Sequence, residues 1–261
     1  MTQNSDPAVP PASAEPWRYV LSAGRTGTVF LESLFAVYAK NAVAVHEPDP
    51  TRYQMMLGNL RNDWNILATT TQRWVHASRR KRLSDAGGSY IEINPFLCSV
   101  TDLLPDPARD LRIVHIVREP ASWARSMTVF KASRKFRWII DYIPFSKPFP
   151  SPRPDGWSDL PQFERNLWRW VWCNQRILAL KPAARAFVTI RYEDLFSQDV
   201  DLRSKTVRKI FEVLDLPAPD QIDWTLFDTR INPAPASEES FDLSAVTRIA
   251  GPSAQVVGYD H

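Results

Sequence analysis

Short apolar runs alternate with longer stretches of helical periodicity along most of the chain. The apolar runs lack a regular polar alternation, which is typical of strands in a parallel sheet that is covered on both faces. The runs that predict strands cover residues 18–22, 41–46, 89–93, 111–117 and 187–191. A sheet built from such strands requires helices on both of its faces.

The segments between these runs carry apolar residues at helical spacing, as Phe30, Leu34 and Tyr38 do on one stripe. Helices are predicted over 29–40, most of 50–83, from about Pro120 onward, over 160–180 and over 201–214. Strands that alternate with helices predict a doubly wound α/β fold, with a mainly parallel sheet flanked by helices.

The two ends of this pattern suggest how the chain is divided. Residues 1–16 are rich in proline, alanine, serine and asparagine, so we expect a disordered tail there. Residues 17–261 are expected to form a single α/β domain, a size that can bury a substantial core. Within it, the pattern is lost at about 130–160, where prolines, basic residues and tryptophans predict an irregular insertion. A lid over an acceptor, a contact with a membrane surface and a solvated basic loop are all compatible with that composition.

Charge and cysteine content narrow the function classes. The net charge of +3 is too small to predict nucleic-acid binding over a whole face, but it leaves room for a local anion site. Two cysteines and four scattered histidines predict neither a disulfide scaffold nor a metal site. The N-terminus has no signal-peptide features, and no apolar run is long enough to span a membrane, so we expect a cytoplasmic protein.

The segment between the first predicted strand and the first helix has the composition of an anion-binding loop. Gly24 and Gly27 let the backbone wrap an anion closely, and the helix that follows presents free N–H groups. Arg25 adds a cation, and Thr26 and Thr28 add hydroxyl donors. The loop lacks the lysine of a Walker A motif, which argues against a kinase or ATPase. A plain strand-to-helix turn with glycines for geometry alone is the alternative.

A second candidate anion contact follows the fourth predicted strand. Arg118 stands at its carboxyl end, where open α/β sheets bind ligands. Ser126 follows about two turns into the next helix, so the two side chains could meet on one phosphate. The alternative is an arginine paired with Glu119 or Asp110.

Together these segments resemble the PAPS-dependent sulfotransferases, which use 3′-phosphoadenosine 5′-phosphosulfate (PAPS) as donor. The loop over 22–31 is similar to the family's 5′-phosphosulfate-binding loop. Arg118 and Ser126, with Pro120 between them, are similar to its 3′-phosphate-binding signature. The YEDL segment over 192–195 and the Gly-Tyr pair at 258–259 also resemble family segments, and all four occur in the family's order.

The resemblance implies a P-loop-like α/β architecture, PAPS as co-substrate and catalysis without a metal. It implies donor-binding roles for Gly24, Arg25, Thr26, Gly27, Thr28, Val29, Arg118 and Ser126. The chain departs from the cytosolic small-molecule branch: that branch has lysine at position 25, a second threonine at position 29 and a late RKG stretch. Arg248 is a weak substitute for the last of these. The pattern is closer to the bacterial and carbohydrate-type branches.

Sulfuryl transfer to a hydroxyl requires a stabilising cation at the leaving oxygen and a base for the acceptor proton. Arg25 suits the first role. Glu47, in a His-Glu-Pro segment, resembles the proposed base of carbohydrate-type enzymes, and His46 could act as the base itself or tune it. Glu92 is a rival base, although a carboxylate inside a buried strand is more often paired with an arginine. Glu193 and Asp194 are expected to be structural.

The sequence therefore predicts a sulfotransferase that acts on a hydroxyl acceptor, such as a glycan or a glycolipid, without nucleic-acid partners or a transmembrane segment. Peripheral contact with a membrane is compatible with the basic insertion. A P-loop-like kinase or other nucleotide-dependent transferase is one alternative. A non-catalytic anion-binding protein is the other.

Overall fold

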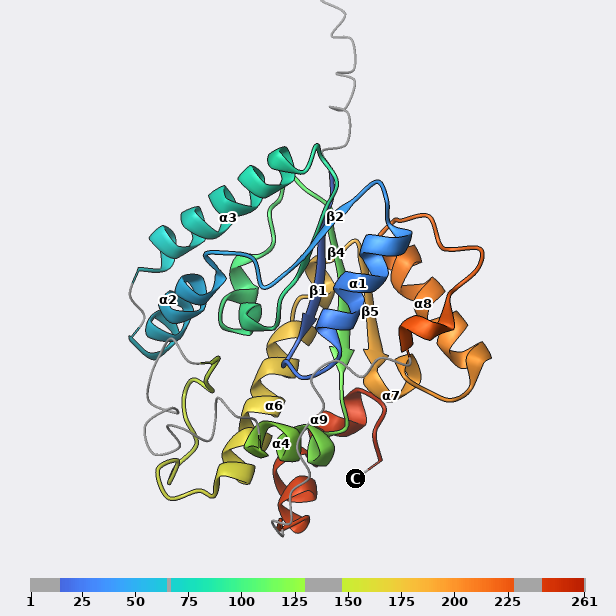
Figure 1. Cartoon of the computed structure of the whole chain (residues 1–261). Coiled ribbons are helices and arrows are strands. Elements are labelled where there is room, and N and C mark those ends of the chain that lie inside the picture. Colours follow the sequence, from blue (N-terminus) through green and yellow to red (C-terminus); the bar gives the residue numbers. More distant parts are fainter. Residues whose placement is uncertain (1–14, 65–66, 130–146, 228–240, 261) are drawn as a thin grey trace, which may run out of the picture.

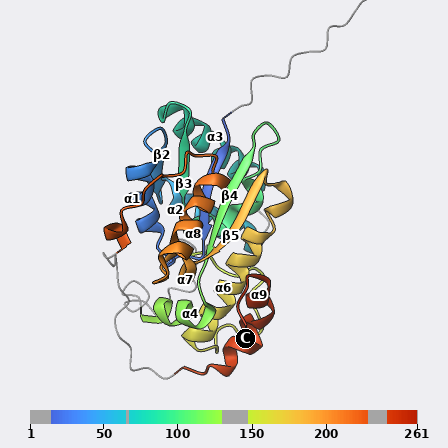
Figure 2. The ribbon, with the colours of Figure 1, turned by 90° about the vertical axis from the view of Figure 1, so that its right-hand side faces the viewer.

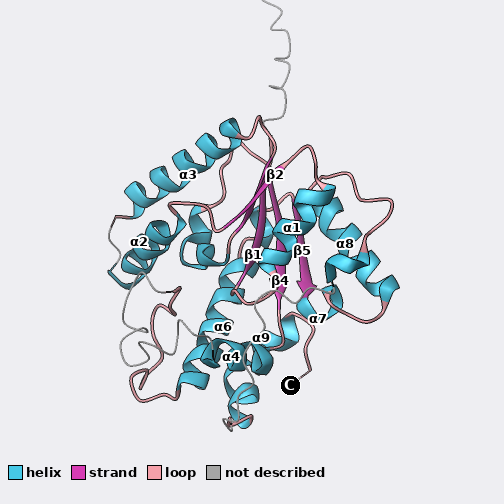
Figure 3. Ribbon diagram, in the orientation of Figure 1, coloured by secondary structure: helices cyan, strands magenta, loops and turns pink. Residues whose placement is uncertain are grey.

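The computed structural model describes residues 15–64, 67–129, 147–227 and 241–260. Its centre is a parallel sheet with the strand order β2-β3-β1-β4-β5 (Figure 3). The strands are β1 (Trp17–Ser22), β2 (Val43–His46), β3 (Tyr90–Ile93), β4 (Leu111–Val117) and β5 (Ala186–Arg191). This arrangement confirms the predicted α/β fold, and each strand lies within two residues of its predicted range.

Helices surround this sheet. The α-helices are α1 (Thr28–Tyr38), α2 (Thr51–Trp64), α3 (Ala68–Asp85), α4 (Pro120–Val129), α6 (Gln162–Leu178), α7 (Tyr192–Leu195), α8 (Val200–Val213) and α9 (Gly251–Val256). Shorter segments are the 3-10 helices η1 (Pro95–Leu103), η2 (Lys181–Ala183) and η3 (Trp224–Phe227) and the π-helix η4 (Val246–Ala250). The predicted helical stretch at 50–83 resolves into α2 and α3, and Leu67 between them adopts a left-handed φ of 57°.

The helices divide between the two faces of the sheet, each of which carries its own apolar core. On β1, Val20 points into a core formed with α1 and α8, while Tyr19 and Leu21 point into one formed with α3, α4, α6 and the C-terminal helices. Figure 1 shows α1 and α8 on one side of the strands and α2 and α3 on the other. Burial on both faces explains why the strands read as continuous apolar runs.

The strand order brings two loops together at the carboxyl edge of the sheet. The chain crosses from β1 to the edge strand β2, returns through β3 and then passes to β4 on the other side of β1. The loops that leave β1 and β4 therefore start side by side, at the point where the direction of the crossovers reverses. Figure 2 shows α4, α6 and α9 gathered below this end of the strands.

The predicted insertion at 130–160 lies partly outside the described residues, because 130–146 are not described. Its remainder packs on α2. Asn59 donates to the carbonyl oxygen of Lys147 at 2.9 Å, and Arg153 pairs with Asp63 at 2.9 Å. Trp157 is buried as well.

Candidate functional site

The loop between β1 and α1 folds into a tight concave turn. Gly24, Arg25 and Gly27 have φ values of 87°, 56° and 75°, all in the left-handed region. Consecutive backbone N–H groups in such turns converge on one point and form an anion-binding nest. Glycine adopts these angles readily, whereas Arg25 is a genuine outlier of the kind that gathers at functional sites.

Contacts from other elements fix this loop from outside. The indole Nε1 of Trp123 on α4 donates to Gly24 O at 2.6 Å. Cys98 on η1 donates its thiol to Ser22 O at 3.2 Å. At Gly27 the ring of Phe196 lies so near that an added Cβ would be 2.7 Å from its Cε2 atom. The loop is therefore held in one shape by the packed core.

Arg118 and Ser126 reach the same loop from the end of β4 and from α4. Arg25 Nε donates to Ser126 Oγ at 3.3 Å, and Arg118 Nη1 donates to the carbonyl oxygen of Arg25 at 3.3 Å. Arg118 and Ser126, which were both predicted to bind the donor's 3′-phosphate, thus adjoin the predicted phosphate loop.

The surroundings of the two guanidinium groups favour an anion. Burial and the neighbouring charge of Arg118 both lower the pKa of Arg25, although Tyr192 opposes them. Arg118 donates to Ser122 Oγ at 2.6 Å and stacks on the Tyr192 ring, 4.8 Å from its centroid. Two like charges held together beside a nest of N–H groups would be stabilised by a bound phosphate or sulfate.

The Glu119 carboxylate, which the sequence offered as an ion-pair partner of Arg118, instead caps a helix. The Glu119 carboxylate accepts from the backbone amides of Ala121 and Ser122 at 2.8 and 2.6 Å, at the start of α4. Asp110 lies at the opposite end of β4, where its carbonyl oxygen accepts from the Trp17 amide. The guanidinium group of Arg118 is therefore directed at the loop.

Two further loop residues bear on the fit of a phosphate. Thr26 is buried, and its hydroxyl has no hydrogen-bond partner among the described residues. A buried hydroxyl without a partner is costly, and a ligand oxygen would satisfy it. Val29 lies half-buried in the first turn of α1, where a threonine would have offered a further hydroxyl.

Thr28, His46 and Glu47 form a chain of polar contacts from the loop to the end of β2. Thr28 Oγ1 lies 2.8 Å from His46 Nε2, and that nitrogen lies 3.7 Å from Glu47 Oε1. The side chains of His46 and Glu47 are 17% and 28% exposed, so both remain accessible. The His46 amide is anchored by Glu32 Oε1 at 2.9 Å. The structure thus brings two of the candidate bases to the phosphate loop.

Glu47 also occupies an unusual backbone position. Its amide donates to Ile93 O at 3.0 Å, which extends the ladder between β2 and β3 by one residue. Its φ of 47° then turns the chain away into the segment that leads to α2. A bulky residue in the left-handed region is strained unless its surroundings hold it there, as at many functional sites.

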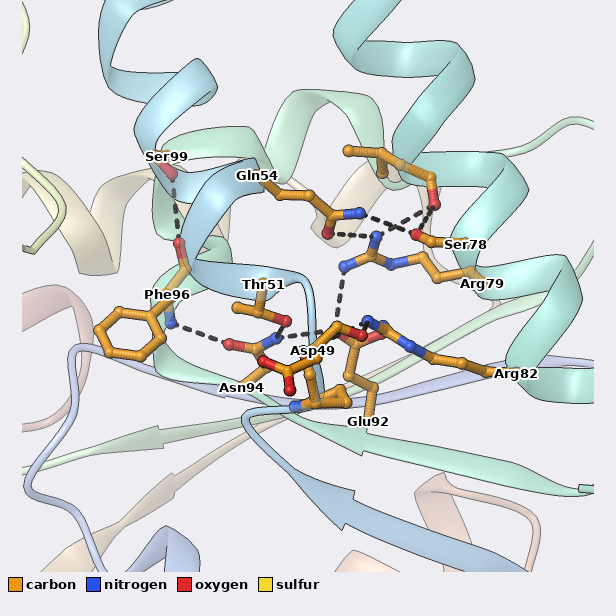
Figure 4. Close-up of polar contacts among 12 residues, drawn as sticks. Asp49, Thr51, Gln54, Ser78, Arg79, Arg82, Glu92, Asn94, Phe96 and Ser99 are labelled. Carbon is orange, nitrogen blue, oxygen red and sulfur yellow. Dashed lines mark hydrogen bonds and ion pairs between the residues drawn. The ribbon is translucent and has the colours of Figure 1, made fainter. Parts of the chain in front are cut away.

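The third candidate base, Glu92, has a different environment. Its carboxylate is buried and pairs with Arg79 at 2.9 Å and with Arg82 at 3.1 Å (Figure 4). Asn94 donates to it at 2.7 Å as well. The two arginines come from α3 and Asn94 follows β3, so the structure does not bring Glu92 together with the phosphate loop residues. Its contacts are those of a structural ion pair.

Arg82 connects this buried network to the segment after Glu47. Its guanidinium group donates to the carbonyl oxygens of Pro48 and Asp49 at 3.2 and 2.5 Å. Figure 4 shows the side chain of Arg82 extending from α3 toward Glu92 and Asp49. Arg82 was not among the site residues predicted from the sequence, where it closes the basic RRKR run at the end of a predicted helical stretch.

Trp123, Ser122 and Tyr192 were not predicted to be site residues either, although Tyr192 begins the YEDL segment and each of the three contacts the loop or Arg118. The contact of Ser122 could have been predicted, because Ser122 follows Arg118 by four residues across the start of a helix. No sequence signal points to the other two contacts, because they join segments far apart in the chain.

The remaining sequence candidates have structural partners. Arg248 pairs with Glu164 at 2.7 Å, and Asp194 pairs with Arg191 at 2.7 Å. Glu193 accepts from Tyr259 and from the Glu119 amide. In the described residues no group of three or more His, Cys, Asp or Glu side chains could hold a metal ion. None of the described helices is long and apolar enough to cross a membrane.

No protein-family model and no curated protein sequence matches the chain. Among solved structures, the chain is similar to the sulfotransferase domain from the Synechococcus PCC 7002 olefin synthase, with a TM-score of 0.51 and 17% sequence identity. The match covers 100% of both chains. At this identity the likeness concerns the fold alone. The chain therefore has an α/β fold like that of a sulfotransferase domain, with five parallel strands flanked by helices.

Proposed function

We propose that this protein is a sulfotransferase that moves the sulfuryl group of PAPS to a hydroxyl of an acceptor, such as a glycan or a glycolipid. One observation carries the proposal: Arg118, at the end of β4, and Ser126, on α4, both contact Arg25 in the nest after β1. The fold of the solved sulfotransferase domain supports it. A donor with a 5′-phosphosulfate and a 3′-phosphate offers one anionic group to each arginine.

In this proposal the loop binds the 5′ end of the donor. The N–H groups of the nest and Arg25 stabilise the charge that develops on the phosphate oxygen as its bond to sulfur breaks. Thr26 contributes its buried hydroxyl as a further donor. Arg118 and Ser126 hold the 3′-phosphate, which remains on the leaving adenosine 3′,5′-bisphosphate.

The acceptor oxygen forms the new bond to sulfur and loses its proton. Glu47 is the proposed base, because its carboxylate is accessible and adjoins His46, which contacts the loop through Thr28. His46 holds or relays that proton through Nε2. Glu92, with both carboxylate oxygens engaged by arginines, has a structural role in this proposal.

The experiment measures nucleotide binding by calorimetry, with adenosine 3′,5′-bisphosphate and Mg-ATP as separate ligands. We expect the bisphosphate to bind more tightly, and Arg25→Ala and Arg118→Ala each to weaken it by about tenfold or more, as expected for a lost charge-assisted contact. Arg208→Ala is the control, because Arg208 is an exposed arginine on α8 that bonds only a carbonyl oxygen in the described contacts. Tighter binding of Mg-ATP would favour a kinase and overturn the proposal.

A second experiment, an assay of turnover, distinguishes an enzyme from a non-catalytic anion-binding protein. Release of bisphosphate from PAPS is followed with glucose, a glucosyl lipid and 4-nitrophenol as acceptor probes. Glu47→Gln should lower that release by about a hundredfold, a common effect of losing a general base, and leave bisphosphate affinity unchanged. Bisphosphate binding without any release, in wild type and variant alike, would leave the non-catalytic alternative standing.

A further inference from the structure

Tyr259 contacts the backbone on both sides of Arg118, directly at Val117 and through Glu193 at Glu119. Tyr259 is buried, and its hydroxyl lies 2.5 Å from Glu193 Oε2 and 3.3 Å from Val117 O. The other oxygen of Glu193, Oε1, accepts from the Glu119 amide at 3.1 Å. The residue before Arg118 and the residue after it are thus both tied to one Tyr-Glu pair, which we call the C-terminal latch (Tyr259 and Glu193).

The donor and acceptor of each hydrogen bond in the latch can be assigned. Burial and the neighbouring Glu193 carboxylate both raise the pKa of Tyr259, so its phenol stays protonated and donates. The phenol proton is directed mainly to Glu193, because that distance is the shorter one and because a carboxylate is a stronger acceptor than a carbonyl. Glu193 is thereby held in place to accept from the Glu119 amide.

Two further side chains hold the segments around the latch and Arg118. Arg191 donates to Gly258 O at 3.2 Å, and its guanidinium carbon lies 5.9 Å from the centroid of the Tyr259 ring. Arg191 also pairs with Asp194 at 2.7 Å, next to Glu193. On the far side, Trp170 donates to the carbonyl oxygen of Arg118 itself at 2.9 Å. The peptide groups around Arg118 are therefore held by Trp170 on α6, Glu193 on α7 and Tyr259 after α9.

We propose that Tyr259 is a positioning residue for the donor's 3′-phosphate and acts through Glu193 and the backbone of Arg118. It does not touch the ligand in this proposal. The inference rests on the proposed function, since it takes Arg118 as the 3′-phosphate contact. Its consequence is selective: loosening the latch should weaken ligands that carry a 3′-phosphate and spare those that lack it.

The test compares adenosine 3′,5′-bisphosphate with adenosine 5′-monophosphate by calorimetry. Tyr259→Phe keeps the buried ring and removes the hydroxyl. We expect bisphosphate affinity to fall by about tenfold, the usual scale for a lost hydrogen bond to a charged group, and monophosphate affinity to stay unchanged. Glu193→Gln, which exchanges one acceptor oxygen for an amide, should give the same selective loss and serves if the first variant folds poorly.

Tyr38→Phe is the matched control. It also removes a phenol oxygen that bonds a backbone group, the Asp223 amide at 2.5 Å, but at the end of α1 opposite the loop. Unchanged bisphosphate affinity in Tyr259→Phe, or an equal loss for both nucleotides, would overturn the latch alone. A wild type that does not prefer bisphosphate to monophosphate would overturn the proposed function and the latch with it.

Discussion

Two candidate site residues, Arg25 after β1 and Glu47 after β2, adopt backbone conformations that most side chains avoid. The sequence indicated an anion-binding loop from its glycines, but it could not show that Arg25 shares their left-handed conformation. Among the described non-glycine residues, Arg25 and Glu47 are two of the four with positive φ. That two candidate catalytic residues appear in so small a group supports a functional role for both, because such strain is retained where the surroundings require it.

Gly27 allows a test of whether the shape of this loop matters for binding. Gly27→Ala would place a methyl group 2.7 Å from the Phe196 ring, at a φ of 75° that disfavours alanine. We expect bisphosphate affinity to fall by at least about tenfold, because the nest must open to relieve the clash. The loss is measured by calorimetry, with thermal unfolding as a check on folding.

Gly156→Ala provides the comparison. Gly156 has a similar φ of 68°, but a Cβ there meets nothing within 4 Å. That variant should lose about 1–2 kcal/mol of stability from the left-handed conformation alone and bind normally. Equal binding by both glycine variants would show that the loop shape does not determine affinity.

At the scale of elements, the sequence was informative where one physical signal dominates. Buried parallel strands must be apolar along their length, so all five strands could be predicted. The 3-10 helix η1 and the π-helix η4 were not predicted, because neither repeats its apolar residues at the 3.6-residue spacing of an α-helix. The insertion was recognised as irregular, yet its packing on α2 depends on contacts that no local pattern contains.

Glu92 illustrates the limit for single residues within an element. Its place in a buried strand is compatible with a general base and with an ion pair, and the sequence does not say which arginine lies opposite. In the structure, α3 supplies Arg79 and Arg82 to its two oxygens, which ties the helix to β3 (Figure 4). These ion pairs join one element of the fold to another, and they do not join a catalytic group to a ligand.

Removing this carboxylate should therefore affect folding. Glu92→Ala leaves Arg79 buried without its ion-pair partner, so we expect the free energy of unfolding to fall by about 3–5 kcal/mol. Urea unfolding measures the change. Asp85→Ala, which breaks an exposed pair with Lys81 on the same helix, should cost less than about 1 kcal/mol. A Glu92→Gln protein that keeps its stability but loses turnover would point instead to a catalytic Glu92.

At the scale of the whole molecule, the candidate site combines segments from the entire length of the chain. The loop after β1, the ends of β2 and β4, and the C-terminal latch meet at one edge of the sheet. The sequence named residues in each of these segments, but their convergence follows from the strand order, which residue patterns do not encode.

His115 lies at the centre of β4, where it couples the stability of the whole fold to pH. It is fully buried, and its Nε2 lies 2.8 Å from Asn174 Oδ1 on α6. Thr189 on β5 lies 3.4 Å from the other ring nitrogen. Asn174 donates its own amide to Trp170 O at 2.8 Å, which leaves its oxygen facing the ring. The histidine is therefore held as a neutral ring that donates from Nε2.

Burial lowers the pKa of His115 from 6.5 to about 4, while the Asn174 hydrogen bond opposes the shift. The unfolded chain therefore takes up the proton first, and stability is lost as pH falls from about 6.5 to about 4. Over that window the loss should reach about 3 kcal/mol. His115→Gln cannot titrate, so the difference in unfolding free energy between wild type and variant should shrink by that amount between pH 8 and pH 4. Urea unfolding at several pH values measures it, and a difference that stays constant with pH would show that His115 titrates alike in the folded and unfolded chain.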